Sequence, residues 1–267
     1  MKNILKYILH FLVICMLTII TQVGGVLYFL TLLTAKAFKL NQLKGLAMFG
    51  VLYLITSFAI LPAMAPVFGR TALPFTGNLK PLNFGTCLLN RHYVTPELKY
   101  QLVEIADEMN KQFAGSVTHY LDGNFPFFNG FPLIPHLSHN DGKKLDLAFF
   151  YTKKDGSINS APGFIGYGIY ESPAEGEVDY PARCREQGYW QYGILSSFVI
   201  NLGNGDYQLD VDRTRTLIKL MAEHRLTSKI FIEPHLKQRW ELDQYKNIRF
   251  QGCRAVRHDD HIHTQVR

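Results

Sequence analysis

The segment HDDHIH at residues 258–263, near the end of this 267-residue chain, decides how its C-terminal half is interpreted. It places three imidazoles and two carboxylates in six positions, and the residues 264–266 that follow it are typical of a strand. Because successive side chains of a strand point to opposite faces, His261 and His263 share one face while Ile262 can enter a core. Two imidazoles on one face of a strand predict part of a zinc site.

A second segment, SHNDGKKLD at residues 138–146, offers further ligands. Gly142 suits a turn, so His139 and Asp146 can come from opposite arms of a bend. A hydrolytic zinc usually takes three protein ligands and keeps a fourth position for water, whose pKa it lowers towards neutrality. The sequence therefore predicts a zinc ion (Zn²⁺) held by His139, Asp146 and His263.

The other polar residues of the C-terminal segment are candidates for catalysis. His261 could act as a general base on the zinc-bound water, or orient that water and stabilise the oxyanion. His258 lies before the strand and could reach the same pocket. Asp259 or Asp260 could hydrogen-bond a liganding imidazole and fix its tautomer. The sequence leaves open which of His258, His261 and Asp260 is the general base.

The pattern S-H-x-x-G-x-x-x-D, followed far downstream by H-D-D-H-x-H, resembles that of the penicillin-insensitive murein endopeptidases. These share a zinc fold with lysostaphin-type peptidases, D-Ala-D-Ala peptidases and the hedgehog signalling domain. The resemblance covers residues 126–267, more weakly over residues 212–240. It implies that His139, Asp146 and His263 are zinc ligands, and that His258 and His261 are additional active-site histidines. The expected function is cleavage of amide bonds in peptidoglycan peptides.

Other interpretations remain open. A D,D- or L,D-carboxypeptidase would trim the same peptide stems. A non-catalytic, hedgehog-like module would bind zinc without turnover. The simplest alternative is a histidine-rich tail that follows an ordinary Asn-Asp-Gly turn. The murein endopeptidases that the chain resembles are usually soluble and secreted, whereas this chain begins with apolar segments.

Two uncharged runs near the N-terminus, residues 7–34 and 45–68, exceed the roughly 20 residues needed to cross a bilayer. They predict a membrane anchor over residues 1–69, followed by a linker over 70–90 and a zinc peptidase domain over 91–267. The anchor holds five Lys and no acidic residue, which leaves 23 basic and 22 acidic residues in the remainder. The basic balance therefore belongs mainly to the membrane region, and no nucleic-acid partner is expected.

A cleaved signal peptide is the alternative for the first run, but that run is long for a signal sequence. Residues 35–37 (Ala-Lys-Ala) have the shape of a cleavage site, yet they lie beyond the whole run. The lysines do not decide which side of the membrane the domain occupies. A murein substrate places the chain in the bacterial inner (cytoplasmic) membrane, with the domain on the periplasmic side.

The expected fold class is α+β, a small antiparallel sheet with flanking helices that carries the zinc site. Thr95-Pro96-Glu97 is a helix start, and an apolar stripe at helical spacing follows it. A second amphipathic helix is expected over residues 212–224. Strands are expected over residues 145–151 and 229–233, with Asp146, Ala148 and Phe150 on one face of the first.

The region 150–197 is rich in glycine and tyrosine without helical periodicity. It is interpreted as an irregular, solvated insertion, with the wall of a substrate groove as the alternative. Three cysteines follow the apolar runs: Cys87, Cys184 and Cys253. Outside the cytoplasm two of them could pair, and we expect the pair Cys184–Cys253.

Overall fold

The structure is a computed structural model that describes residues 2–189, 192 and 206–267. The chain divides into two compact units, each assembled from segments distant in sequence. The first comprises Met1–Ala72, Phe84–Thr95 and Gly123–Gly142. The second comprises Leu73–Asn83, Pro96–Asp122 and Lys143–Arg267. Each unit is described separately below.

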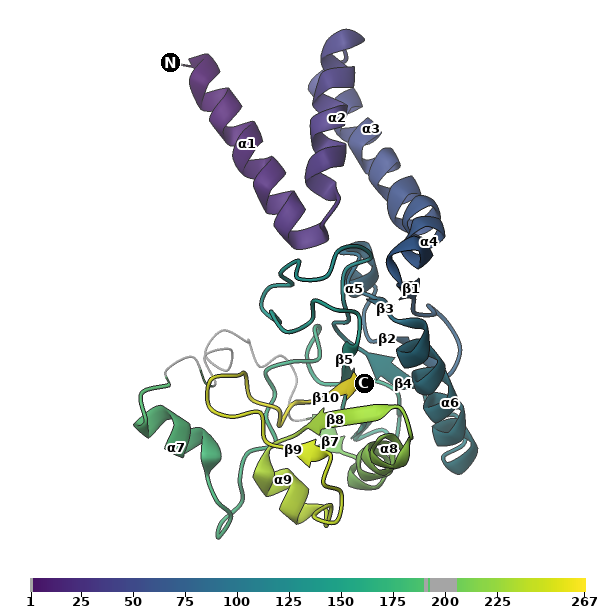
Figure 1. Cartoon of the computed structure of the whole chain (residues 1–267), viewed down its shortest axis with the longest axis vertical. Coiled ribbons are helices and arrows are strands. Elements are labelled where there is room, and N and C mark those ends of the chain that lie inside the picture. Colours follow the sequence, from purple (N-terminus) through teal and green to yellow (C-terminus); the bar gives the residue numbers. More distant parts are fainter. Residues whose placement is uncertain (1, 190–191, 193–205) are drawn as a thin grey trace. The chain divides into compact units, whose positions relative to one another are not determined.

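Helices make up most of the first unit (Figure 1). In chain order its helices are α1 (Lys2–Thr21), α2 (Gly24–Ala37), α3 (Gln42–Ile55), a π-helical turn (Thr56–Ile60), α4 (Leu61–Met64), a 3₁₀ turn (Ala65–Phe68) and α5 (Gly85–Leu88). Short antiparallel strands, β1 (Thr71–Ala72) and β3 (Tyr93–Val94), pair within the same unit. The stretch Gly123–Gly142 is almost entirely irregular.

The first predicted span, residues 7–34, is not a single helix. The chain leaves α1 at Gln22, whose φ of 67° lies in the left-handed region, and it re-enters a helix at Gly24. A Cβ at Gly25 would lie 2.0 Å from the hydroxyl oxygen of Thr18, so glycine is needed where α2 approaches α1. Small residues permit such close helix packing in apolar surroundings, and here they mark a helical hairpin.

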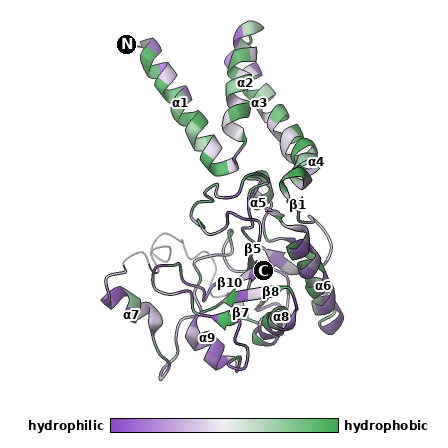
Figure 2. Cartoon of the chain, viewed as in Figure 1, coloured by the Kyte–Doolittle hydropathy of each residue, from purple (hydrophilic) through white to green (hydrophobic). Residues whose placement is uncertain are grey.

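Within the described part of the chain, two helical segments are long and apolar enough to cross a membrane: Asn3–Thr21 and Gln42–Phe68. The first, near the N-terminus, also has the character of a signal sequence. With 14 residues, α2 is about 21 Å long and shorter than the hydrocarbon core of a bilayer. Figure 2 shows that hydrophobic residues predominate along α1 and α3. This distribution suits helices whose surroundings are lipid.

The predicted linker, residues 70–90, is not an unstructured connection. It contributes β1 and α5 to the first unit, and it contributes strand β2 (Leu79–Pro81) to the second. Pro81 ends β2, which is an edge strand where a missing backbone N–H is tolerated. The Pro, Gly and Asn content of the segment indicated a linker because these residues also occupy edges and tight turns.

A mixed sheet of six strands forms the centre of the second unit (Figure 1). Its spatial order is β2, β4 (Thr118–Tyr120), β5 (Lys144–Ala148), β10 (His261–Val266), β8 (Thr227–Phe231) and β9 (Ile248–Arg249). The pairs β2–β4 and β8–β9 are parallel, and the three pairs between them are antiparallel. The α+β class is confirmed, but the sheet is larger than expected and is not purely antiparallel.

The amphipathic helices of the second unit follow the sequence pattern. Helix α6 (Pro96–Gln112) buries its stripe of Leu98, Leu102, Ile105 and Met109. Helix α8 (Val211–Glu223) buries Leu217, Ile218 and Met221, and the side chain of Asp210 caps its N-terminus. A short helix, α9 (Pro234–Arg239), begins immediately after Glu233. Both long helices were predicted correctly because their apolar faces repeat at helical spacing.

The strand predicted over residues 145–151 ends at Ala148. After this point the N–H of Phe150 donates to the hydroxyl of Thr214, and the Phe150 carbonyl accepts from the N–H of Asp210. A separate strand, β6 (Tyr151–Lys153), then pairs with β7 (Tyr207–Leu209). The apolar run does not reveal this break, because the hydrogen-bond partners of the Phe150 backbone come from Asp210 and Thr214, at the start of α8.

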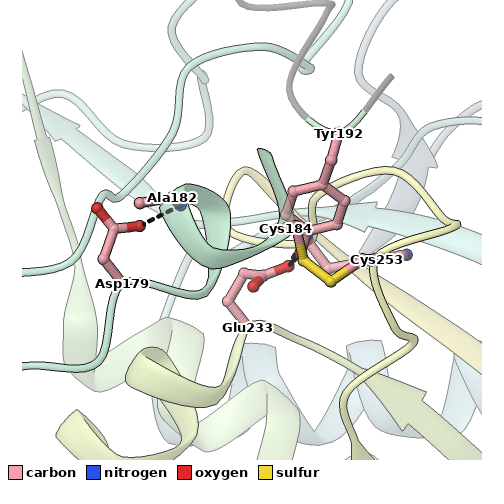
Figure 3. The surroundings of a disulfide bond; sticks show 7 residues. Asp179, Ala182, Cys184, Tyr192, Glu233 and Cys253 are labelled. Carbon is pink, nitrogen blue, oxygen red and sulfur yellow. Dashed lines mark hydrogen bonds between the residues drawn. A yellow bond between two sulfur atoms is a disulfide. The ribbon is translucent and has the colours of Figure 1, made fainter. Parts of the chain in front are cut away.

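The predicted disulfide between Cys184 and Cys253 is present (Figure 3). Cys184 belongs to α7 (Tyr180–Glu186), and Cys253 lies in the loop that leads to the HDDHIH segment. Cys15 and Cys87 do not take part in this disulfide. The bridge therefore joins an irregular region to the segment that carries the candidate catalytic residues.

The described part of the region 150–197 is irregular apart from β6 and α7, as expected, but it is not simply solvated. Tyr151, Tyr167 and Tyr192 are buried. Residues 190, 191 and 193–197 lie outside the described residues. The buried tyrosines show that part of the region belongs to the core of the second unit.

Candidate metal centre

Strands β5 and β10 place Asp146 and His263 opposite each other. Paired residues on neighbouring strands point to the same face of a sheet, so these side chains meet. His263 Nδ1 lies 2.9 Å from Asp146 Oδ1, and both residues are buried. His261, two positions earlier on β10, has its Nε2 3.9 Å from the same Asp146 oxygen. Asp146 is therefore the point on which both strand histidines converge.

The second carboxylate oxygen of Asp146 is held by Tyr167. The Tyr167 hydroxyl donates to Asp146 Oδ2 at 2.9 Å and accepts from the N–H of Asp122 at 3.2 Å. The tyrosine ring also lies edge-on to His261, with 4.9 Å between the ring centroids. These contacts fix the orientation of the carboxylate and leave its Oδ1 directed at the histidines.

Asp260 fixes the ring of His261. Its Oδ1 accepts from His261 Nδ1, and its Oδ2 accepts from the backbone N–H of Gly168. Burial favours the neutral imidazole, but the carboxylates of Asp260 and Asp146 outweigh this effect and raise the pKa of His261 to about 9. With Nδ1 engaged by Asp260, Nε2 is the nitrogen that faces Asp146.

His258 lies beside the two strand histidines. Its ring centroid is 4.9 Å from that of His261 and 5.7 Å from that of His263. Its backbone is anchored by Glu233, because the N–H of His258 donates to Glu233 Oε1 at 3.1 Å. The Tyr192 hydroxyl donates to the same carboxylate oxygen, next to the disulfide (Figure 3). Burial raises the pKa of Glu233 to about 7.

Asp259 contacts Arg257 and His235. It forms a buried, two-bond ion pair with Arg257, and His235 Nε2 lies 3.7 Å from its Oδ2. The Arg257 guanidinium also stacks on the ring of Tyr170, 3.9 Å from its centroid. Of the two aspartates proposed to support a histidine, Asp260 therefore contacts His261 and Asp259 stabilises the loop before it.

Two further buried histidines, His136 and His139, lie in the irregular stretch before β5. His139 Nδ1 lies 2.9 Å from the carbonyl oxygen of Gly123, and the two imidazole centroids are 5.3 Å apart. A ring that donates one N–H to a carbonyl presents its other nitrogen, here Nε2, as a potential ligand. This is the arrangement common among metal-binding histidines.

Among the described residues, His136, His139 and Asp146 form a buried group that could hold a metal ion. Each offers one ligand atom, and these atoms lie within 4.8 Å of one another. Two imidazole nitrogens and a carboxylate oxygen form a donor set that suits zinc. Two of the three predicted ligands, His139 and Asp146, belong to the group. The third, His263, contacts Asp146 but is not a member.

Sequence reasoning missed His136, Tyr167 and Glu233. His136 stands three residues before His139, a spacing that was available in the sequence but that an irregular proline-rich segment does not make meaningful. Tyr167 and Glu233 belong to no recognisable motif, since their roles depend on contacts with Asp146 and His258. Only the folded backbone reveals such partners.

Comparison with known proteins adds no relative: no family model matches the chain, and no curated protein matches its sequence.

Proposed function

We propose that this chain is a membrane-anchored zinc peptidase that hydrolyses amide bonds in peptidoglycan peptides, and specifically a murein endopeptidase. The observation that carries the proposal is the buried His136, His139 and Asp146 group. His263 and His261 both face Asp146, as the H-x-H motif requires. The resemblance of the two motifs to murein endopeptidases supplies the substrate class.

The donor groups fit a zinc ion. His139 Nδ1 contacts a backbone carbonyl and Asp146 Oδ2 accepts from Tyr167, which orients both side chains, and each residue of the buried group offers one ligand atom. His263 would supply the third ligand of the proposed set. A zinc ion bound there would supply an activated water and polarise the substrate carbonyl.

The remaining groups would orient the substrate and move protons. His261, fixed by Asp260 and protonated at neutral pH because its pKa is raised to about 9, would stabilise the developing oxyanion, and His258 would take up the proton of the attacking water. His258 would approach the same reacting atoms, because its ring packs against those of His261 and His263. Glu233 would keep His258 in place through the backbone. A protonated histidine could then donate to the leaving amine.

Digestion of purified murein sacculi tests the function. The full chain in detergent, with zinc, should split the peptide crosslinks, and mass spectrometry should show dimeric muropeptides converted to monomers. A chelator should prevent the conversion, and added zinc should restore it. Shortened stems with intact crosslinks would indicate a carboxypeptidase instead. No change in the muropeptides would contradict both peptidase activities and leave a zinc-binding module.

The proposed location is the bacterial inner membrane, with the second unit on the periplasmic side. The Cys184–Cys253 disulfide supports this location, because reducing cytosol opposes such bonds. We expect alkaline phosphatase fused after Arg267 to be active, since the enzyme requires export, and the same reporter fused after Asn41 to be silent. The reverse pattern would place the site in the cytosol, where crosslinked murein is absent.

A further inference from the structure

The ends of the apolar helices in the first unit are bound to two irregular segments. The amide of Gln22, just after α1, accepts from the N–H of Phe127 at 3.0 Å and donates to its carbonyl at 3.4 Å. Phe68 is the last residue of the candidate span Gln42–Phe68. The centroid of its ring lies 4.6 Å from the ring centroid of Phe127. One phenylalanine therefore contacts the ends of both candidate spans.

The segment around α5 is attached to the same helices (Figure 1). Asn90 donates to the carbonyl of Thr21 at 3.2 Å, and the Tyr53 hydroxyl donates to the carbonyl of Leu88 at 2.6 Å. The rings of Phe58 and Phe84 stack with centroids 5.4 Å apart. Both irregular segments are thus held where the apolar helices end.

These segments expose large apolar side chains. Phe128 is 62% exposed, Ile134 51% and Leu137 60%, and the neighbouring segment adds Phe84 and Leu88. Residues 81–90 and 123–140 contain no Asp, Glu, Lys or Arg. Exposed apolar surface without charged residues is unfavourable in water, whereas aromatic side chains are enriched at the boundary between lipid and water.

We infer that Phe84, Leu88, Phe128, Ile134 and Leu137 form an apolar collar that lies in the interface between the bilayer and water. The partner is the lipid surface itself, because the collar is continuous with the ends of the helices proposed to cross it. The inference rests on the proposed membrane anchoring. Since His136 and His139 belong to the same stretch as Ile134 and Leu137, the collar would hold them at the membrane surface. The substrate would then be peptide close to the membrane.

Tryptophan quenching in nanodiscs tests the collar. Full-length variants Phe128→Trp and Leu137→Trp would be reconstituted with lipids brominated near the carbonyl end of the acyl chain, and the signal of the unsubstituted chain would be subtracted. Val51→Trp, on the exposed face of α3, is the membrane control, and it is measured with lipids brominated near the middle of the acyl chain because Val51 lies well inside the span Gln42–Phe68. Tyr100→Trp is the matched control for water, because Tyr100 is exposed on α6 among charged residues.

The collar is supported if Val51→Trp, Phe128→Trp and Leu137→Trp are quenched at least twofold more than Tyr100→Trp. Quenching of Val51→Trp alone would overturn the collar while the anchor stands. Equal quenching of Tyr100→Trp would also overturn it, because the lipid contact would not be particular to these residues. If Val51→Trp is not quenched, the anchor fails and the collar with it. Quenching should be unchanged after zinc removal, because the collar does not depend on the metal. A chain that shows the expected quenching but does not split murein crosslinks would contradict the peptidase proposal alone.

Discussion

Zinc binding is expected to be lost when Asp146 is replaced by alanine, and likewise for His139→Ala and His263→Ala. Each change removes one of three proposed ligands. Loss of a residue that hydrogen-bonds a metal ligand already weakens metal binding about 10–100-fold, so loss of a ligand should weaken it by more than about 100-fold. Elemental analysis of the purified full-length variants, together with zinc titration, measures this. Cleavage of murein crosslinks should disappear in parallel.

His261→Ala is the matched control, since it removes a buried imidazole from the same strand face without removing a proposed ligand. It should keep its zinc and lose activity. His136→Ala decides between the two ligand sets that share His139 and Asp146. Retained zinc in His136→Ala, with zinc lost from His263→Ala, supports the proposed set. The opposite result would assign the third ligand to His136. Full zinc occupancy in Asp146→Ala would contradict a metal centre here.

A large loss of stability is expected when Arg257 is replaced by alanine. The change leaves the fully buried carboxylate of Asp259 without its two-bond partner. Breaking a buried ion pair from one side typically costs about 3–5 kcal/mol. For a protein of this size the melting temperature should fall by about 6–20 °C, as measured by thermal unfolding of the full chain in detergent.

Arg215→Ala is the control for this prediction, because Arg215 pairs with the exposed carboxylate of Glu241. An exposed pair contributes at most about 1 kcal/mol. The double variant Arg257→Ala/Asp259→Ala should be more stable than Arg257→Ala alone, since it removes the unpaired charge as well. A fall in melting temperature no greater than that of Arg215→Ala would show that the buried pair does not stabilise the loop before His258.

The elements that the sequence predicted well have strong local patterns. The stripe from Leu98 to Met109 repeats at helical spacing and forms α6. The alternation in the HDDHIH segment places His261 and His263 on one face of β10, with Ile262 buried. The disulfide was predicted correctly from only three cysteines that follow the apolar runs. In each case the information lies within a short stretch, or within a small set of residues.

The errors concern features that depend on partners distant in sequence. The run from residue 7 to 34 contains no Asp, Glu, Lys or Arg, but its glycines permit the close packing that divides it into α1 and α2. The predicted linker supplies β2 because an edge strand needs a neighbour, and that neighbour, β4, lies about forty residues later. The strand at Asp146 stops at Ala148 because Thr214 and Asp210 bind the backbone beyond it.

By itself, the sequence determined the residue types of the candidate centre, the two apolar segments and the faces of the long helices. These features follow from the periodicity of a helix or strand and from the chemistry of each side chain. The tertiary structure alone decided which groups meet: Tyr167 and His263 on Asp146, Asp260 on His261, and Glu233 on the backbone of His258. Hydrogen bonds between distant segments depend on the register of the sheet and the course of the loops, and a local pattern of residues encodes neither.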